Sequence, residues 1–508
     1  MRITPCQAAL AAAIVLNLLL LLVSRLFPLP GASPPCRHPR AVPALVPGVT
    51  VILRDFHGPD HDVAATSRSF SSLPGVAVLV AAEVAPYPPA ALPAGVTVLS
   101  LRPEPHRPPP RPELAVTTRH VALVPDGARA VPGLLKRMMD ALESSEDGAV
   151  KVVAAAAGEE KPRCLSLEVD VKAWTARYGH QSDQRSDQRS DRRSDQRSDQ
   201  RGVRCGALDG APAVLLLRSR DLFSLPFPLS RPVVTSLSLQ AALRGWRLLL
   251  LPDSFPLTPK PLQTPHSRWK SRNFLEKQHR ELMELFSLKL ELLPDGRQRW
   301  HGCTKETPRC FGTIHSQTPQ YLLGGRWTPP CCLRALRITA RHVLEQLESA
   351  GIRHWLEGGS LLGAVRSGDI IPWDYDVDVG LYLEDVPKCP WLAAVLATGG
   401  PVEDPQGFFW EKAAEGEFFR VHFSRTNRLH VDLWPFYPGR GGVMTKDTWL
   451  GHGQDVEFPE RFLVPLGSVR FVGVEAKAPN DPRGFLELKF GPGAVENPQY
   501  PNPGVRRL

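Results

Sequence analysis

The stretch Ile352-Arg-His-Trp-Leu-Glu-Gly358-Gly359-Ser360-Leu-Leu-Gly-Ala-Val-Arg366 has the pattern of a strand, a tight Gly358-Gly359 turn and a helix that begins at Ser360. Glycines let a backbone approach a ligand closely, and N–H groups in a first helical turn lack partners inside the helix. These groups, with the positive end of the helix dipole, suit a phosphate. We predict that Gly358, Gly359 and Ser360 bind a phosphate, and that Arg366 adds a contact. The alternatives are a turn that only reverses the chain and, for Arg366, a surface salt bridge.

A run of carboxylates follows at Asp374-Tyr-Asp376-Val-Asp378, between apolar residues on both sides. Side chains two apart in a strand share a face, so we expect Asp376 and Asp378 to project together and Asp374 to join them at the strand entrance. Such carboxylates raise one another's pKa unless a cation lies among them. Mg²⁺ and Mn²⁺ favour hard oxygen ligands and bridge to substrate phosphates. A solvated acidic turn is the alternative, which the apolar flanks disfavour.

A further carboxylate, Asp432, lies in the apolar run Leu429–Phe436 and follows another strand-like run at 418–423. We expect Asp432 to reach the same site from a neighbouring strand. Asp432 and Asp374 are both candidates for a third metal ligand and for the base that accepts a proton. A carboxylate that only supports local structure is the alternative. His430 is either a substrate-binding residue or a strand histidine whose hydrogen bonds are satisfied.

A glycine turn, an Asp-x-Asp and a distal strand Asp occur together in the nucleotidyltransferase superfamily. The sequence from Leu356 to Asp378 closely resembles that of the LicD-type branch of this superfamily, which moves phospho-alcohols from CDP carriers. Phe485–Gly491 resembles the C-terminal motif of that branch, with Phe490 where Tyr is common. The resemblance extends over nearly the whole chain, to one group of membrane-anchored members, through segments 124–129, 327–332, 443–449 and 497–503. It implies an α+β nucleotidyltransferase-like catalytic domain.

The same resemblance implies an activity. It is the transfer of ribitol 5-phosphate from CDP-ribitol onto the ribitol-phosphate-primed O-mannosyl glycan of α-dystroglycan, with release of CMP. It also implies a single-pass type II Golgi membrane protein, catalytic part lumenal, acting beside enzymes of the same glycan pathway such as fukutin. On this interpretation Asp376 and Asp378, completed by Asp432 or Asp374, hold Mg²⁺ or Mn²⁺. The alternatives are a Mn²⁺-dependent sugar-nucleotide glycosyltransferase of the same glycan pathway, which also uses Asp-x-Asp, and a non-catalytic scaffold.

The N-terminal half has the sequence pattern of an α/β domain. Short apolar runs alternate with helical stretches such as 130–146, which predicts a largely parallel sheet with strands at 49–53, 76–80, 96–99, 120–124 and 150–153. Val124-Pro-Asp126-Gly127 lies where a glycosyltransferase metal motif could be, but it lacks the second carboxylate. We therefore predict a degenerate glycosyltransferase-like stem domain over 47–265 and a catalytic domain over 266–508.

The N-terminus carries the clearest targeting signal. Residues 7–23 are almost continuously apolar, close to the length of a helix that crosses a bilayer. We expect an uncleaved transmembrane anchor between a cytoplasmic tail, 1–6, and a stalk, 24–46; a cleaved signal peptide is the alternative. The net charge of +9 is spread along the 508 residues, which argues against a nucleic-acid partner. We further expect a homo-oligomer.

Residues 182–201 are five tandem tetrads of the Ser-Asp-Gln-Arg type and carry no apolar side chain. Such a segment cannot bury enough surface to offset its ordering entropy, so it predicts a disordered loop. Cys164 and Cys205 flank it. In a lumenal chain they can form a disulfide that closes the loop, with unrelated buried thiols as the alternative.

Four further cysteines lie close together in the sequence: Cys303, Cys310, Cys331 and Cys332. Four thiolates can hold a structural zinc ion, although adjacent ligands are unusual. From spacing alone, zinc and lumenal disulfides are equally supported. The family resemblance implies zinc, and therefore a zinc loop over 303–332.

Overall fold

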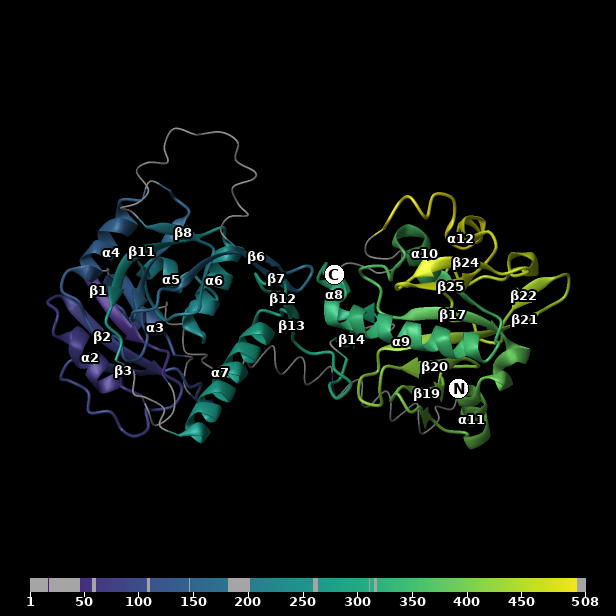
Figure 1. Cartoon of the computed structure of the whole chain (residues 1–508), viewed down its shortest axis with the longest axis horizontal. Helices are drawn as coiled ribbons and strands as arrows, with labels where there is room; N and C mark the ends of the chain where they lie inside the picture. Colours follow the sequence, from purple (N-terminus) through teal and green to yellow (C-terminus); the bar gives the residue numbers. More distant parts are fainter. Residues whose placement is uncertain are drawn as a thin grey trace.

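The computed structural model describes Asn17 and residues 46–56, 61–106, 110–145, 147–180, 202–258, 264–309, 311–314 and 318–499. The predicted tail, nearly all of the anchor and stalk, the tetrad loop and Cys310 therefore lie outside the described residues. Among the residues that are described, no helix is long and apolar enough to cross a membrane. The described chain forms an N-terminal and a C-terminal body, and helix α7 (Pro265–Leu285) packs on the N-terminal body, on the side nearer the C-terminal one (Figure 1).

The N-terminal body is built on an eight-stranded sheet in the order β3-β2-β1-β4-β10-β5-β11-β8. Its strands are β1 (Val46–Leu53), β2 (Val76–Ala82), β3 (Thr97–Ser100), β4 (Thr118–Val124), β5 (Val150–Ala157), β8 (Val203–Cys205), β10 (Ala213–Arg218) and β11 (Arg247–Phe255). All five predicted runs are strands, and they run in the same direction as one another and as β11, so the sheet is largely parallel as predicted. Only β8 and β10 of its eight strands run the opposite way. Strand β10 is antiparallel to both β4 and β5, because it returns beside β5 after an excursion through a second sheet.

Helices cover both faces of this sheet. The neighbouring β1 residues Val51 and Ile52 are both fully buried, each in a different apolar cluster, as expected for a strand with two packed faces. The helices are α2 (Val63–Ser71), α3 (Pro112–Ala115), α4 (Leu134–Glu143), α5 (Ser219–Phe223) and α6 (Val233–Leu243). The helix predicted over 130–146 is α4, which starts later because Gly133 precedes it with a φ of +79°.

A second, five-stranded sheet has the order β13-β12-β7-β6-β9. Its strands are β6 (Arg163–Asp170), β7 (Thr175–His180), β9 (Ala207–Asp209), β12 (Leu290–Leu292) and β13 (Gln298–Trp300). Strand β12 pairs in parallel with β7, so the chain that follows α7 completes a sheet begun before it. Helix α7 begins with a capping box formed by Thr264 and Ser267 and ends at Leu285. The predicted Cys164–Cys205 disulfide is present and joins β6 to β8.

The C-terminal body has a sheet whose main path is β16-β17-β21-β20-β19-β18. The strands are β16 (His354–Leu356), β17 (Val377–Tyr382), β18 (Val402–Glu403), β19 (Phe409–Lys412), β20 (Phe419–His422) and β21 (His430–Pro438). Helices α9 (Pro330–Ser349), α10 (Gly358–Ser367), α11 (Pro390–Thr398) and α12 (Pro482–Phe490) pack around it (Figure 1). Its core is strongly aromatic, and fully buried rings include Trp355, Trp410, Phe418, Phe436 and Phe485.

Candidate active site

The glycine motif lies at the connection between β16 and α10. The sequence predicted a turn at Gly358 and Gly359 with the helix starting at Ser360, but α10 begins at Gly358 itself. Gly358 has a φ of +51°, which disfavours any residue with a side chain. A Cβ atom on Gly359 would lie 2.8 Å from the Oδ2 atom of Asp374. Both glycines are therefore needed, one for backbone conformation and one for the close approach of a carboxylate to the helix start.

Two hydrogen bonds tie the start of α10 to β17. The backbone N–H of Asp378 donates to the Ser360 hydroxyl at 2.8 Å, and the N–H of Glu357 donates to the Asp378 carbonyl at 3.0 Å. The N–H groups of a helical first turn lack acceptors within the helix. The arrangement thus brings anion-binding backbone groups beside the acidic strand, where a phosphate and its counter-ion could meet.

A buried ion pair holds the residue before this helix. The Glu357 carboxylate accepts a hydrogen bond from the indole N–H of Trp355 at 2.8 Å and pairs with Lys489 of α12. Both charged residues are only 6% exposed. Lys489 lies in the C-terminal Phe485–Gly491 motif, so that motif supplies the counter-charge for the glycine turn.

The predicted carboxylates gather at the entrance to β17. The strand begins at Val377, so Asp376 precedes it and only Asp378 lies within it, contrary to the expectation that both would be strand residues. Burial raises the pKa of Asp374 to about 6 despite hydrogen bonds from the Tyr375 N–H and with Asp376. Burial and the nearby Asp378, Asp374 and Asp432 carboxylates raise the pKa of Asp376 well above its usual range.

Asp378 and Asp432 are register partners on the parallel strands β17 and β21. Burial, with the Asp432 charge next in effect, raises the pKa of Asp378 to about 7, while a 2.9 Å hydrogen bond from the Trp434 indole opposes this rise. Asp432 itself is gripped by Arg420 of β20, whose Nε and Nη2 atoms lie 2.8 and 3.3 Å from its two carboxylate oxygens. Asp432 is therefore near the acidic site as predicted, but its charge is already paired.

These residues suit a hard divalent cation. Burial, with the repulsion between neighbouring carboxylates next in effect, raises the pKa values of Asp376 and Asp378, and a bound cation would relieve that repulsion. In the part of the chain that the structure describes, two other clusters each bring three ligand atoms within 4.8 Å of one another, one of cysteines and one of two histidines and Glu291. The carboxylates around β17 are less closely grouped than these. Mg²⁺ commonly uses one or two carboxylates together with waters and substrate phosphates, and so does not require a tighter cage.

The two basic residues predicted to contact substrate have different surroundings. The His430 Nε2 atom lies 3.9 Å from Asp432 Oδ1, and burial lowers the pKa of His430 to about 4, so the ring is neutral at pH 7. Arg366 lies in the last turn of α10, and its guanidinium donates to the carbonyls of Ala494 and Val495. In the structure Arg366 thus holds the C-terminal segment, and its contact with a substrate phosphate stays a prediction.

The structure adds residues that the sequence did not single out. Arg420 pairs with Asp432, Lys489 with Glu357, and Trp434 donates to Asp378. Alternation offered a signal only for Trp434, because it lies two residues from Asp432 in the same strand and so faces the same side. The other two pairs join separate elements.

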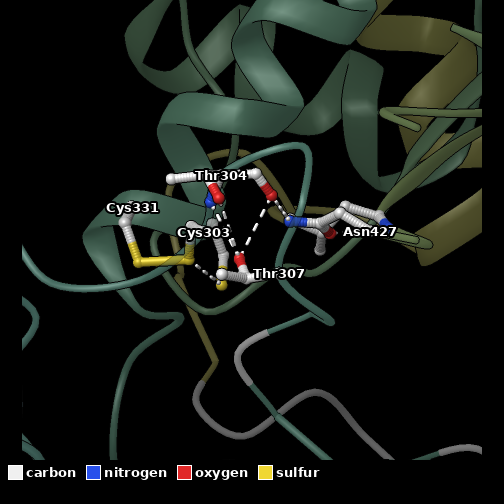
Figure 2. The surroundings of a disulfide bond; sticks show 7 residues. Cys303, Thr304, Thr307, Cys331 and Asn427 are labelled. Carbon is white, nitrogen blue, oxygen red and sulfur yellow. Dashed lines mark hydrogen bonds between the residues drawn. A yellow bond between two sulfur atoms is a disulfide. The ribbon is translucent and has the colours of Figure 1, made fainter. Parts of the chain in front are cut away.

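The cysteine cluster joins Cys303, in the loop that leads into the C-terminal body, to Cys331 and Cys332 in the first turn of α9 (Figure 2). Cys303 and Cys331 form a disulfide, and the Cys332 sulfur lies 3.1 Å from that of Cys303. Three of the four predicted zinc ligands therefore share one cluster, whereas the fourth, Cys310, lies outside the described residues. The loop is fastened to the connection between β20 and β21, because buried Asn427 donates to the Thr304 carbonyl at 2.9 Å. It thus abuts the strand that carries Asp432.

Comparison with known proteins agrees with this arrangement. A family model described as the fukutin-related protein stem domain matches residues 36–294. The chain is 54% identical over 517 aligned residues to ribitol 5-phosphate transferase FKRP of Homo sapiens, covering 100% of this chain and 99% of that protein. This chain belongs to the fukutin-related protein family. The corresponding protein of Mus musculus is 53% identical with the same coverage.

A second family model, described as the LicD/FKTN/FKRP nucleotidyltransferase domain, matches residues 351–481. Ribitol-5-phosphate transferase FKTN of Homo sapiens is 24% identical over 164 residues, covering 31% of this chain and 33% of that protein. The predicted LicD-type resemblance is therefore confirmed, and so is its extension over the whole chain. For this member of the fukutin-related protein family, the glycine turn and all four carboxylates lie inside the LicD match, whereas the Lys489 helix lies just beyond it.

Proposed function

We propose that this protein is a ribitol 5-phosphate transferase that uses CDP-ribitol as donor and the ribitol-phosphate-primed O-mannosyl glycan of α-dystroglycan as acceptor, with CMP as the other product. The observation that carries the proposal is the meeting of the α10 N-terminus with Asp374, which precedes β17, and with Asp378, which lies in it. Backbone N–H groups that suit a phosphate lie there beside carboxylate oxygens that suit a cation, and phosphoryl transfer uses both. The relatives named as ribitol 5-phosphate transferases supply the transferred group.

In this proposal Asp376 and Asp378 hold Mg²⁺ or Mn²⁺, and Asp374 lies beside them through its hydrogen bond to Asp376. The ion, when bound, neutralises negative charge on the donor diphosphate and on the leaving CMP. The backbone of Gly358 and Gly359 and the start of α10 bind and orient a donor phosphate. Asp432 supports the site through its position beside Asp378 and is kept in place by Arg420.

The base that accepts the proton of the acceptor hydroxyl is assigned to Asp374. Burial raises the pKa of Asp374 to about 6, close to the operating pH that favours a general base. Asp432 is the weaker candidate, because both of its oxygens accept charge-assisted hydrogen bonds from one guanidinium. Neutral His430 is proposed to bind substrate from the rim of the site.

We also propose a type II Golgi membrane protein with its catalytic part in the lumen, acting as a homo-oligomer beside fukutin and related glycan-pathway enzymes. The Cys164–Cys205 disulfide supports an oxidising compartment. Asp126, at the carboxyl end of β4, uses its carboxylate to accept the Asp62 N–H at 2.8 Å. That local role fits a stem that retains only a degenerate form of a glycosyltransferase metal motif.

For the cysteine cluster we propose a structural zinc ion held by Cys303, Cys310, Cys331 and Cys332. The support is the convergence of three of these sulfurs on one point. A thiolate site requires the Cys303 and Cys331 sulfurs to be reduced, so zinc and the disulfide are alternative states of the same atoms. Free-thiol counting of the denatured chain under argon, with zinc measured in the same sample, distinguishes them. Oxidised Cys303 and Cys331 in active protein would contradict the zinc proposal.

The transferase proposal is tested with the full chain, CDP-ribitol, Mg²⁺ or Mn²⁺ and a ribitol-phosphate-primed acceptor. Release of CMP and a mass gain of one ribitol phosphate on the acceptor are expected. UDP- and GDP-sugars serve as control donors and should give no product. Transfer that persists in EDTA, or in the Asp376→Asn variant, would contradict the mechanism.

A further inference from the structure

A cluster of histidines and one carboxylate lies outside the site described above. Glu291 is the central residue of β12, His279 lies on α7 and His301 directly follows β13. The Nε2 atoms of both histidines lie 2.8 Å from the same Glu291 oxygen, Oε2. The β12-β13 hairpin and helix α7, which lie side by side (Figure 1), therefore bring three ligand-type atoms within 4.8 Å of one another.

The carboxylate at the centre of this cluster is almost completely buried. The Glu291 side chain is only 2% exposed, and those of His301 and His279 are 10% and 21% exposed. Half-buried Tyr178 of β7 also hydrogen-bonds to Glu291, and desolvation, with the Glu291 charge next in effect, raises the pKa of Tyr178 so that it stays a neutral donor. The carboxylate is thus held from a second side.

Three groups converge on one carboxylate oxygen in this cluster. The Nε2 atoms of His279 and His301 each lie 2.8 Å from Glu291 Oε2, and Nη1 of Arg299 lies 3.4 Å from the same oxygen. With protons on both Nε2 atoms, all three groups donate to the carboxylate. In the other tautomer both Nε2 lone pairs face the carboxylate oxygen, and a cation between the three atoms would stabilise that arrangement.

The atoms suit a transition metal. Two histidine nitrogens and one glutamate oxygen form a common zinc set, with a fourth position left for water. The three ligand atoms lie within 4.8 Å of one another. Tetrahedral zinc holds its ligands about 3.3 Å apart, so the side chains need only small shifts. Arg299 competes as a cation, but its side chain is 51% exposed and can turn into solvent.

We propose that His279, Glu291 and His301 bind a divalent transition metal ion, with zinc as the expected occupant. The ion would fasten the last helix of the stem to the β12-β13 hairpin. His301 lies two residues before Cys303, so this metal would stiffen the connection from which the cysteine loop departs. The site is separate from the carboxylates of β17 and from the thiolate cluster, because its ligands are nitrogen and oxygen from other elements.

The test measures zinc content and not transfer activity. The full chain is stripped with a chelator, loaded with Zn²⁺ in excess Mg²⁺ to occupy the acidic site, and dialysed. We expect the His279→Gln/His301→Gln double variant to bind one zinc ion per chain fewer than the parent protein. His266→Gln is the matched control, since His266 is exposed on the same helix, and it should keep the full content. Equal zinc content in the parent and the folded double variant would overturn the proposal.

A second measurement on the parent chain does not depend on how the variant folds. Zinc X-ray absorption is expected to show nitrogen and oxygen neighbours at about 2.0–2.1 Å, with the outer-shell scattering of imidazole. A spectrum with sulfur neighbours alone, at about 2.3 Å, would overturn the proposal, as would a folded parent that retains no zinc.

Discussion

Asp378 of β17 and Asp432 of β21 are paired residue to residue in a parallel ladder, so their carboxylates stand side by side on one face of the sheet. Arg420 of β20 is the next partner in the same row and faces Asp432. One row across three strands therefore presents two negative charges and one positive charge. The Arg420 guanidinium is paired with Asp432, so a bound cation would stabilise the Asp378 carboxylate more than the Asp432 carboxylate.

This row predicts opposite effects on activity and stability. Asp378→Asn is expected to lower transfer at least about a hundredfold, the scale of losing one preorganised electrostatic group. The thermal unfolding midpoint should stay the same or rise, because the substitution removes repulsion with Asp432. Activity assays and calorimetry on the same preparation check both. Asp447→Asn, at an exposed carboxylate bonded to Tyr437, is the control and should retain activity. A loss of stability equal to that of a core substitution would contradict the assignment.

The close approach of Gly359 to Asp374 predicts that Gly359→Ala impairs catalysis more than folding. The added methyl group would meet the Asp374 carboxylate at 2.8 Å and displace it. Displacements of this size cost roughly ten- to a hundredfold in rate. Gly400→Ala is the control, because no atom lies within 4 Å of its new Cβ atom. Wild-type turnover in Gly359→Ala would show that the Asp374 position is unimportant for the reaction.

The Lys489–Glu357 ion pair predicts a strong energetic coupling between α12 and the glycine turn. Lys489→Met leaves the Glu357 charge buried, and such losses destabilise by about 3–5 kcal/mol. The double variant Lys489→Met/Glu357→Gln should be less destabilised than the sum of the single variants, by about 1–3 kcal/mol. Denaturant unfolding of all four proteins measures this. Lys477→Met breaks an exposed pair with Glu348 and should change stability by less than about 1 kcal/mol. Additive single effects would refute the coupling.

Glu411 predicts a pH-dependent contribution to stability. The hydrogen bond from His422, with the Arg428 charge, lowers the pKa of Glu411 from 4.5 to about 2. A carboxylate whose pKa is lower in the folded than in the unfolded protein stabilises the fold at pH values above its unfolded-state pKa. This contribution is lost as the pH falls towards its folded-state pKa. Glu411→Gln should therefore lower the free energy of unfolding at pH 7 by about 1–3 kcal/mol, and the unfolding midpoint should fall with it.

The difference between parent protein and Glu411→Gln should shrink between pH 5 and pH 2. Thermal unfolding at several pH values tests this. Glu417→Gln, at a 60% exposed carboxylate paired with Lys412, is the control and should give a small, pH-independent difference. A Glu411→Gln difference that is the same at pH 7 and pH 3 would contradict the assignment.

Some features of the fold followed directly from periodicity. The apolar runs predicted in the N-terminal half are strands, and the helical stretch predicted over 130–146 contains helix α4. The five predicted strands are parallel as expected, but the antiparallel strand β10 between β4 and β5 was not predicted, because strand direction depends on where the chain returns and not on the composition of the run. Helix α10 begins at Gly358, two residues before the start predicted at Ser360. Its first two residues are glycines, and glycine has no strong conformational preference that would mark the start of a helix.

The sequence by itself determined the chemistry available to the site: carboxylates at Asp374, Asp376, Asp378 and Asp432, and glycines where a backbone must approach them. It did so because these groups lie within short, strongly patterned segments. The tertiary structure alone decided which charges are paired. Arg420 reached Asp432 through strand register, Lys489 reached Glu357 through helix packing, and Arg366 turned to carbonyls near the C-terminus. Such pairings join residues on separate elements, and packing, not local periodicity, selects them.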